Sequence, residues 1–334
     1  MVIACVLAGG TGTRLYPATR ADRPKQFLAL GGERSLLART VDRLAFADET
    51  LVSTGLAYEP GVRDRVDAET VVEPAPCDTG PAAAYVTHLL NERYDDPTVL
   101  VCPSDHVVRD DDAFRETATR AARVAERTGR LVTLGVVPTR PDPGYGYLEP
   151  GTERDGWAPL DRFHEKPSRE TAADYLARGF RWNAGIFAWR ASAFLSAARA
   201  SPLAPLLDAP DDSDVVGGFE AVPSVSVDKA VMENAADRDE AALVPAEFGW
   251  DDLGTWDAVG RQASDETANA AFADLTAVDA RGNVAWADDE IHVSLVGVSD
   301  LAVVAVDDRV LVVPRARANE VRTLVERLRD DGRY

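Results

Sequence analysis

The stretch VLAGGTGTRLYPATRADRPKQF, residues 6–27, combines a glycine-rich turn with two widely spaced cations. Its glycines are Gly9, Gly10 and Gly12. Glycines let the backbone take left-handed angles and approach a ligand closely, so that amides face anionic oxygens. The spacing fits neither the P-loop nor the dinucleotide fingerprint. Because a simple surface turn does not need Arg14 and Lys25, we interpret this stretch as a phosphate-binding loop.

The composition limits the class of protein. The chain has 334 residues, enough for two domains with a sizeable core. A formal net charge of −20 argues against nucleic acid and membrane as partners. The first apolar run, MVIACVLAGG, is too short to span a bilayer and lacks a basic leader, so we interpret it as a strand. The three scattered cysteines and the four histidines show no metal spacing, and we expect a reducing, cytoplasmic location.

Lysine is rare in this chain. Lys25, Lys166 and Lys229 are the only lysines among 36 basic residues. An acidic, lysine-poor surface is typical of proteins adapted to a high-salt cytosol, where dense charge keeps the chain hydrated. The composition therefore predicts a halophilic protein that unfolds in low salt.

The elements that must position the loop alternate between strands and helices. Apolar runs rich in β-branched residues predict strands at 1–8, 50–54, 70–74, 98–103 and 130–137. Helical patterns occupy 35–47, 80–94 and 112–129. This alternation predicts an α/β, Rossmann-like fold with a mixed, mainly parallel sheet and helices on both faces. Ligands of such sheets bind beyond the carboxyl ends of the strands, where the glycine loop lies.

The pattern changes toward the C-terminus. Residues 162–167 and 182–190 read as strands on either side of a helix at 168–179. From about residue 270 short strands follow one another, ending in a helix at 318–331. We expect a catalytic domain at 1–268 and a small β-rich domain at 269–334.

Seven motifs occur in one order along residues 1 to about 260. They are LAGGTGTRLYPATRADRPKQF (7–27), PSDH (103–106), GYGYLE (144–149), FHEKP (163–167), WNAGIF (182–187), SVDKAVME (226–233) and WDDLGTW (250–256). Together they closely resemble the mannose-1-phosphate guanylyltransferases, or GDP-mannose pyrophosphorylases, among the sugar-1-phosphate nucleotidyltransferases. The resemblance implies transfer of GMP from GTP to mannose 1-phosphate, giving GDP-mannose and pyrophosphate. In that reaction a sugar-phosphate oxygen attacks the α-phosphorus in line.

The resemblance also assigns the nucleotide and metal residues. Arg14 and Lys25 would bind the triphosphate and the leaving pyrophosphate. Asp105 and Asp252 would hold one Mg²⁺, although Asp105 could be a helix N-cap and Asp251 competes with Asp252. The nucleotide contacts implied are Leu7, Ala8, Gly9, Gly10, Gly12, Thr13, Asp78, Thr79, Gly80 and Ser104.

The sugar-phosphate site implied by the resemblance comprises Gly146, Glu165, Lys166, Asn183 and Gly185. Glu165 and Lys166 point to opposite faces if they lie within one strand, so we expect the strand to end before Pro167. Lys166 would meet the phosphate and Glu165 the hydroxyls.

Two acidic residues of the sixth motif remain open. Asp228 either caps a helix or supports the sugar site, and Glu233, five residues later, does not share its face on an α-helix. Lys229 receives no role.

Base recognition is the least determined feature. Relatives commonly have Arg-Asn before the threonine of PCDTGPAAA (76–84), where this chain has Cys77-Asp78. Asp78 either accepts from the N1 and N2 donors of guanine or caps the following helix. Uridylyl or thymidylyl transfer to another hexose 1-phosphate is therefore the alternative reaction, and a non-catalytic regulatory subunit is a further one. The strand-rich tail resembles the short left-handed β-helix that helps relatives to dimerise, which implies a homodimer.

Overall fold

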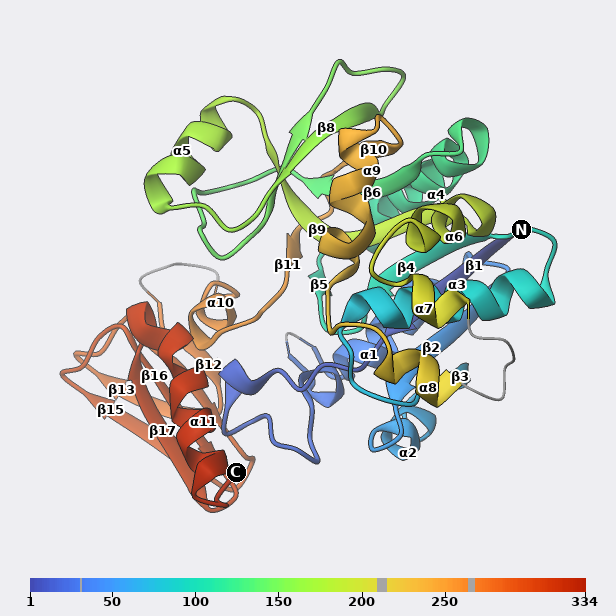
Figure 1. The fold of residues 1–334 in the computed structure, drawn as a ribbon. Helices are drawn as coiled ribbons and strands as arrows, with labels where there is room; N and C mark the ends of the chain where they lie inside the picture. The colour runs from blue at the N-terminus through green and yellow to red at the C-terminus, as the bar shows by residue number, and fades with distance from the viewer. Residues whose placement is uncertain (31, 209–214, 264–267) are drawn as a thin grey trace. The chain divides into compact units, whose positions relative to one another are not determined.

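The computed structural model describes residues 1–30, 32–208, 215–263 and 268–334 (Figure 1). The chain forms two compact units, each assembled from separate stretches. The first unit comprises residues 1–9, 40–104 and 108–250. The second comprises residues 10–39, 105–107 and 251–334. The chain passes from one unit to the other at five points, three of which lie in α1 (Leu36–Arg43), β5 (Val107–Val108) and β11 (Trp250–Asp251).

The first unit is built on a mixed sheet. In the described residues it has nine strands in the order β3-β2-β1-β4-β9-β6-β10-β8-β7. The strands are β1 (Val2–Leu7), β2 (Glu49–Gly55), β3 (Glu69–Glu73), β4 (Thr98–Pro103), β6 (Leu131–Val136), β7 (Tyr147–Pro150), β8 (Ala158–His164), β9 (Arg181–Arg190) and β10 (Ala241–Ala246). Neighbours from β3 to β4 are parallel, as are β6 and β10, whereas β9 is antiparallel to β4 and β6. The predicted mixed α/β fold is confirmed.

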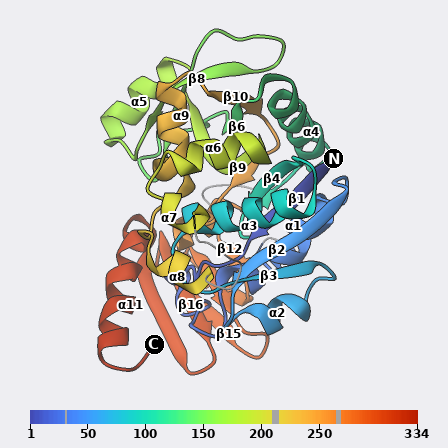
Figure 2. The same cartoon turned by 45° about the vertical axis from the view of Figure 1, so that its right-hand side comes forward.

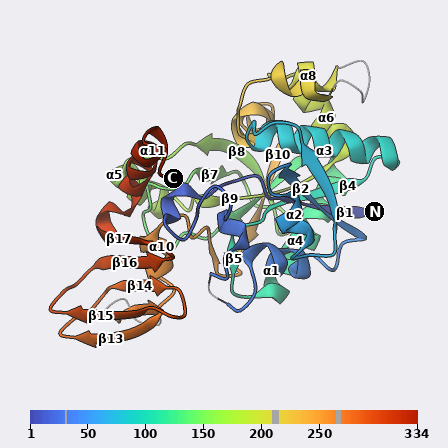
Figure 3. The same ribbon diagram turned by 90° about the horizontal axis from the view of Figure 1, so that it is seen from below.

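Helices cover both faces of this sheet. They are α2 (Glu59–Arg63), α3 (Thr79–Arg93), α4 (Asp111–Thr128), α5 (Arg169–Ala177), α6 (Ala191–Arg199), α7 (Ala204–Leu207), α8 (Val215–Glu220) and α9 (Glu233–Asp237), with a π-helix at Asp228–Met232. Helices α3 and α6 lie side by side on one face (Figure 2), and α4 packs on the other (Figure 3). Strands covered on both faces need continuous apolar sequence, which explains why Ile3–Val6 are fully buried.

The second unit contains the strand-rich tail. Its strands are β12 (Ala270–Phe272), β13 (Asp274–Val278), β14 (Val284–Ala287), β15 (His292–Val296), β16 (Leu301–Val306) and β17 (Arg309–Pro314). Strands β12, β14 and β16 form one parallel ladder and β13 and β15 another, so successive strands alternate between two ladders as in a β-helix. Strand β17 pairs antiparallel with β16. The helical elements are η1 (Thr13–Leu15), η2 (Lys25–Phe27), α10 (Trp256–Gly260), η5 (Arg315–Glu320) and α11 (Val321–Asp330).

One hydrophobic cluster joins the glycine-loop segment to this tail within the second unit. Leu15, Leu28 and Leu30 pack in it with residues of β16 and α11 such as Val304 and Val325. The described helices include none that is long and apolar enough to cross a membrane.

Candidate functional site

The glycine loop is shaped around Lys25. Gly12 has φ +67°, and a Cβ built on it would lie 2.5 Å from the Cβ of Lys25, so this position requires glycine. The carbonyl of Gly12 accepts hydrogen bonds from the Thr19 hydroxyl at 2.9 Å and the Leu15 amide at 3.0 Å. A Cβ on Gly10, in contrast, would meet no atom within 4 Å. The loop is therefore in close contact with Lys25 at Gly12, whereas a side chain at Gly10 would have free space.

Lys25 connects the two predicted metal ligands. Its side chain is only 4% exposed, and its Nζ donates to Oδ2 of Asp105 at 2.8 Å. The same Nζ donates to the backbone carbonyl of Asp252. A buried ammonium needs such acceptors, since losing its hydration is otherwise costly. The structure thus brings Lys25, Asp105 and Asp252 together within the second unit.

The N-cap alternative for Asp105 is wrong. Helix α4 is capped by Asp110, whose carboxylate accepts from the Ala113 amide at 2.9 Å. Asp105 instead directs its carboxylate to Lys25, and its side chain remains 34% exposed.

Arg14 and Asp252 meet at Gly254. A Cβ built on Gly254 would lie 3.0 Å from Nη2 of Arg14 and 3.1 Å from Oδ2 of Asp252. The Gly254 amide donates to Oδ1 of Asp252 at 3.0 Å, which fixes the carboxylate. Arg14 itself is exposed. Two cations and two carboxylates of the predicted site therefore share one cluster.

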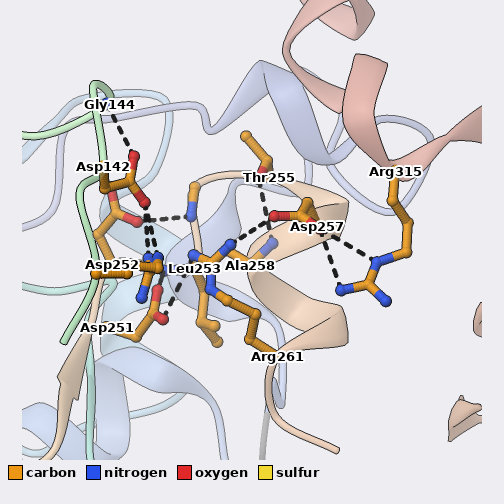
Figure 4. A network of polar contacts seen from close by, with 12 residues as sticks. Asp142, Gly144, Asp251, Asp252, Leu253, Thr255, Asp257, Ala258, Arg261 and Arg315 are labelled. Carbon is orange, nitrogen blue, oxygen red and sulfur yellow. Dashed lines mark hydrogen bonds and ion pairs between the residues drawn. The ribbon is translucent and has the colours of Figure 1, made fainter. Parts of the chain in front are cut away.

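The neighbouring carboxylate, Asp251, is drawn with Asp252 in the polar network of Figure 4. It lies 3.5 Å from Arg261, which also pairs with Asp257 at 2.6 Å. Asp257 continues the network to Arg315 at 3.1 Å. Asp251 is therefore held by Arg261, and Asp252 as the ligand beside Asp105 stays a prediction.

The charges of the cluster shift the pKa values of its members. Burial raises the pKa of Asp105, but Lys25 and His106 outweigh that effect, so the pKa of this carboxyl is lowered overall. Burial lowers the pKa of His106, and the nearby acidic groups only partly oppose it. Lys25 therefore favours the charged form of Asp105, and burial favours the neutral form of His106.

These residues fit a divalent metal as a partial ligand set. Carboxylate oxygens are the ligands that Mg²⁺ prefers, and one or two of them commonly hold it together with phosphate oxygens and water. Among the described residues, no three acidic, cysteine or histidine side chains are grouped to hold a metal alone. Asp105 and Asp252 would therefore share the ion with a phosphate ligand.

The predicted sugar residues lie in the first unit, at the ends of β7, β8 and β9. Strand β8 ends at His164, so Glu165 and Lys166 lie beyond it, as predicted. Both are exposed, and Glu165 lies 3.9 Å from the ammonium of Lys229. The described contacts do not bring Lys166 to Asn183.

Asn183 lies on β9 at the centre of a small hydrogen-bond network. Its Nδ2 donates to Oδ1 of Asp228 at 2.7 Å. Its Oδ1 accepts from the amide of Gly185 at 3.0 Å, where the glycine has φ +64°. Its backbone amide donates to the carbonyl of Gly146 at 2.9 Å. The structure therefore joins Gly146, Asn183 and Gly185 and adds Asp228.

The segment after Asp228 departs from the predicted α-helix. Residues 228–232 form a π-helix in which the Glu233 amide donates to the Asp228 carbonyl. Because a π-helix bonds residue i to i+5, five residues make about one turn, and Glu233 returns toward the face of Asp228. The α-helical periodicity assumed from the sequence does not apply here.

In the first unit, the predicted nucleotide-binding residues are held mainly by hydrogen bonds to backbone amides and carbonyls. Asp78 caps α3, accepting from the Thr79 amide at 2.7 Å, and has φ 70°. The Thr79 hydroxyl accepts from the Val227 amide at 3.0 Å. A Cβ on Gly80 would lie 2.5 Å from the carbonyl of Val225, so the segment needs glycine there. The capping alternative for Asp78 is confirmed.

Leu7, Ala8 and Ser104 stand at the carboxyl edge of the sheet. The Ala8 amide donates to the Ser53 carbonyl at 2.7 Å, and the Ser104 amide donates to that of Leu7 at 3.0 Å. Sequence reasoning missed a fourth residue at this edge, Glu73.

Glu73 ends β3 and is 7% exposed. Its Oε1 accepts from the Ser53 hydroxyl at 2.7 Å, and its Oε2 would lie 3.6 Å from a Cβ on Gly9. Burial raises the pKa of Glu73, and the Glu73 carboxylate adds to the raised pKa of Cys77. The carboxylate thus lies close to Gly9 and acts on Cys77, which precedes α3. An acidic residue at the end of an apolar strand run, TVVE, was the available signal.

Comparisons with known proteins identify the family of the chain. The family model described as nucleotidyl transferase matches residues 3–269. The model described as MannoseP isomerase/GMP-like beta-helix domain matches residues 274–328.

Similar proteins include xanthan biosynthesis protein XanB of Xanthomonas campestris pv. campestris, 36% identical over 99% of this chain and 74% of that protein. The mannose-1-phosphate guanylyltransferase of Escherichia coli is 35% identical over 98% of this chain and 74% of its own length. A solved structure from Thermus thermophilus, named a mannose-1-phosphate geranyltransferase, has a TM-score of 0.90 and 36% identity, covering 98% of this chain and 99% of that one. The family resemblance of the sequence is confirmed: the chain is an enzyme of the nucleotidyl transferase family that carries a MannoseP isomerase/GMP-like β-helix domain.

Proposed function

We propose that this enzyme transfers GMP from GTP to mannose 1-phosphate and releases pyrophosphate. The observation that carries the proposal is Lys25, whose buried Nζ joins Asp105 and Asp252 beside Gly12. Two polyanions must meet in this reaction, so fixed cations and metal-binding carboxylates supply most of the catalysis. Relatives named mannose-1-phosphate guanylyltransferase support the choice of substrates.

The chain's own residues divide the work. Arg14 and Lys25 bind the triphosphate and stabilise the charge that develops on the leaving pyrophosphate. Mg²⁺ held by Asp105 and Asp252 would supply further charge neutralisation at the phosphates. The family generally uses a divalent metal, and Mg²⁺ is our assignment for it.

The base is read by carboxylate acceptors in this proposal. Guanine presents two adjacent donors, N1–H and N2–H, and Glu73 offers an oxygen that has no hydrogen-bond donor among the described residues. The Asp78 carboxylate already accepts from the Thr79 amide. We therefore assign the guanine contact to Glu73 rather than to Asp78.

The sugar phosphate is bound by the first unit. Lys166 binds its phosphate, Glu165 accepts from its hydroxyls and Asn183 donates to a sugar oxygen. We further propose a homodimer working in a high-salt cytoplasm, in accord with the net charge of −20.

The decisive experiment measures pyrophosphate release from GTP, UTP, dTTP and ATP with mannose 1-phosphate, glucose 1-phosphate and N-acetylglucosamine 1-phosphate. Each pair is run with Mg²⁺ in molar KCl and in low salt. A preference for GTP with mannose 1-phosphate supports the proposal. Turnover of UTP or dTTP instead overturns the base assignment, and no turnover with any pair supports a regulatory subunit.

A further inference from the structure

The side-chain amide of Asn183 is oriented by protein contacts on both of its ends. Its Oδ1 accepts from the Gly185 amide at 3.0 Å and from the Thr133 hydroxyl at 3.3 Å. A carbonyl oxygen has two lone pairs, so these donors satisfy it. Its Nδ2 donates one N–H to Asp228 at 2.7 Å. The second N–H has no acceptor among the described residues, so the amide can meet a ligand only as a donor.

Asp228, which accepts from the Asn183 amide, lies at the start of a π-helix. It begins the π-helix at residues 228–232, and its carbonyl accepts from the Glu233 amide. The next residues of the turn, Ala230 and Val231, are buried in the core and anchor it. Such single π-turns inside helical segments frequently occur at functional sites. Asp228 and Asn183 both remain partly accessible, so a ligand can reach the amide that they share.

We propose that Asp228 is a positioning residue for the sugar-phosphate substrate: it holds the Asn183 amide so that its second N–H faces a ring or hydroxyl oxygen of the sugar. This inference rests on the proposed function for the identity of the ligand. It assigns a use to the sixth sequence motif, whose acidic residues the reaction itself leaves unexplained.

The surroundings make this positioning dependent on pH. Two acidic groups act on Asp228, Glu165 from the loop after β8 and Glu233 on α9. Lys229, on the same turn, lies 3.9 Å from Glu165 and acts on Glu233. Burial raises the pKa of Asp228 to about 6, Glu165 and Glu233 add to it, and the Asn183 hydrogen bond opposes it. Above this pKa the carboxylate is a full acceptor for the amide. Below it, protonation weakens the hydrogen bond that orients Asn183.

Two substitutions separate positioning from a merely structural role. Asp228→Ala removes the acceptor, and we expect KM for mannose 1-phosphate to rise about tenfold or more, because a charged hydrogen bond is lost, with KM for GTP unchanged. Asp228→Asn keeps an acceptor that does not titrate. It should restore KM for mannose 1-phosphate. The ratio of the wild-type KM to that of Asp228→Asn should rise as the pH falls below about 6, and the titration of the substrate's own phosphate cancels in this ratio. Equal increases of both KM values in Asp228→Ala would overturn the inference, as would a ratio of wild-type KM to Asp228→Asn KM that does not change with pH.

A second readout does not depend on catalysis. In the unliganded protein labelled with ¹⁵N-asparagine, the side-chain amide signal of Asn183 should titrate with a midpoint near 6 in wild type and stay constant in Asp228→Asn. The signal is assigned by its loss in Asn183→Ser. If wild type turns over no mannose 1-phosphate but this titration is seen, the proposed function fails while the Asp228–Asn183 coupling stands. A flat titration in wild type overturns the coupling itself.

Discussion

The Nζ of Lys25 lies 2.8 Å from Oδ2 of Asp105, and the lysine side chain is almost completely buried in this contact. The lysine therefore holds a carboxylate in place. In the proposed function, it would also supply positive charge to the triphosphate. A metal ion with bound phosphate at Asp105 would share the Asp105 carboxylate with the ammonium of Lys25.

Lys25→Met should lower kcat for pyrophosphate release by about 10²- to 10³-fold, because fixed positive charge at the phosphates is lost. The rate is measured with saturating GTP and mannose 1-phosphate. Arg322→Gln on α11, whose side chain is 73% exposed, is the matched loss of one cation and should leave kcat unchanged. A Lys25→Met enzyme within about threefold of wild type would contradict the assignment.

Gly12→Ala should destabilise the protein by about 1–3 kcal/mol, since alanine is strained at φ +67° and its Cβ would collide with Lys25. Gly55→Ala is the control, because a Cβ there meets nothing within 4 Å. Thermal unfolding of both variants in molar KCl makes the comparison. Equal melting temperatures for the two variants would show that the loop relaxes at no cost.

Asp252→Asn should reduce kcat at least about 100-fold and raise the Mg²⁺ concentration needed for half-maximal activity. Asp251→Asn changes the adjacent carboxylate, which pairs with Arg261, and should remain within about threefold of wild type. Mg²⁺ titrations of both variants test the choice between the two aspartates. If Asp251→Asn shifts the Mg²⁺ dependence and Asp252→Asn does not, the ligand assignment is reversed.

Glu73→Gln should lower kcat/KM for GTP about tenfold or more while that for UTP is unchanged or raised. The glutamine amide replaces one acceptor by a donor, which opposes the guanine donors but suits the N3–H and O4 groups of uracil. Asp78→Asn, at the cap of α3, should leave the GTP/UTP ratio as in wild type. Competition between the two nucleotides in one assay measures the ratio directly. A changed ratio in Asp78→Asn alone would return base recognition to Asp78.

Stability should depend on pH through Asp228. Its pKa is about 6 in the folded protein against an ordinary 3.8, so between these values the folded state binds a proton that the unfolded state releases. Stability therefore decreases as the pH rises through this window, by at most about 3 kcal/mol. The melting temperature of Asp228→Asn minus that of wild type should increase from pH 4 to pH 6.5 and then level off. A difference that stays constant with pH would refute the raised pKa.

Much of the fold was predictable because its elements have strong local patterns. The strand at 98–103 and the helix at 112–129 carry uninterrupted apolar and amphipathic patterns, and the structure places β4 and α4 there. The end of β8 before Pro167 was predictable from the missing proline amide. The direction of β9 was not, because an antiparallel strand between parallel neighbours depends on the path of the chain and not on local composition.

Residues of the candidate site could be predicted where they belong to a sequence motif. They were harder to predict where only a tertiary contact identifies them. Lys25 and Asp105 are 80 positions apart, and only their motifs indicated a common role. Glu73 was missed because its burial beside Gly9 depends on two other strands. The wide turn at Asp228 was missed because α and π geometry share the same apolar pattern.

The core shared by the loop segment and the tail limits how this protein can be recombined. Leu15, Leu28 and Leu30 on one side, and Val304 and Val325 on the other, belong to one packed cluster. A chimera that took only the strand-rich tail from a relative would replace the tail residues of this cluster and keep those of the loop segment. Small mismatches of side-chain volume in a packed core already reduce stability. Residues 10–39 and 251–334 are therefore expected to be inherited, and to diverge, as a single module despite their distance in the sequence.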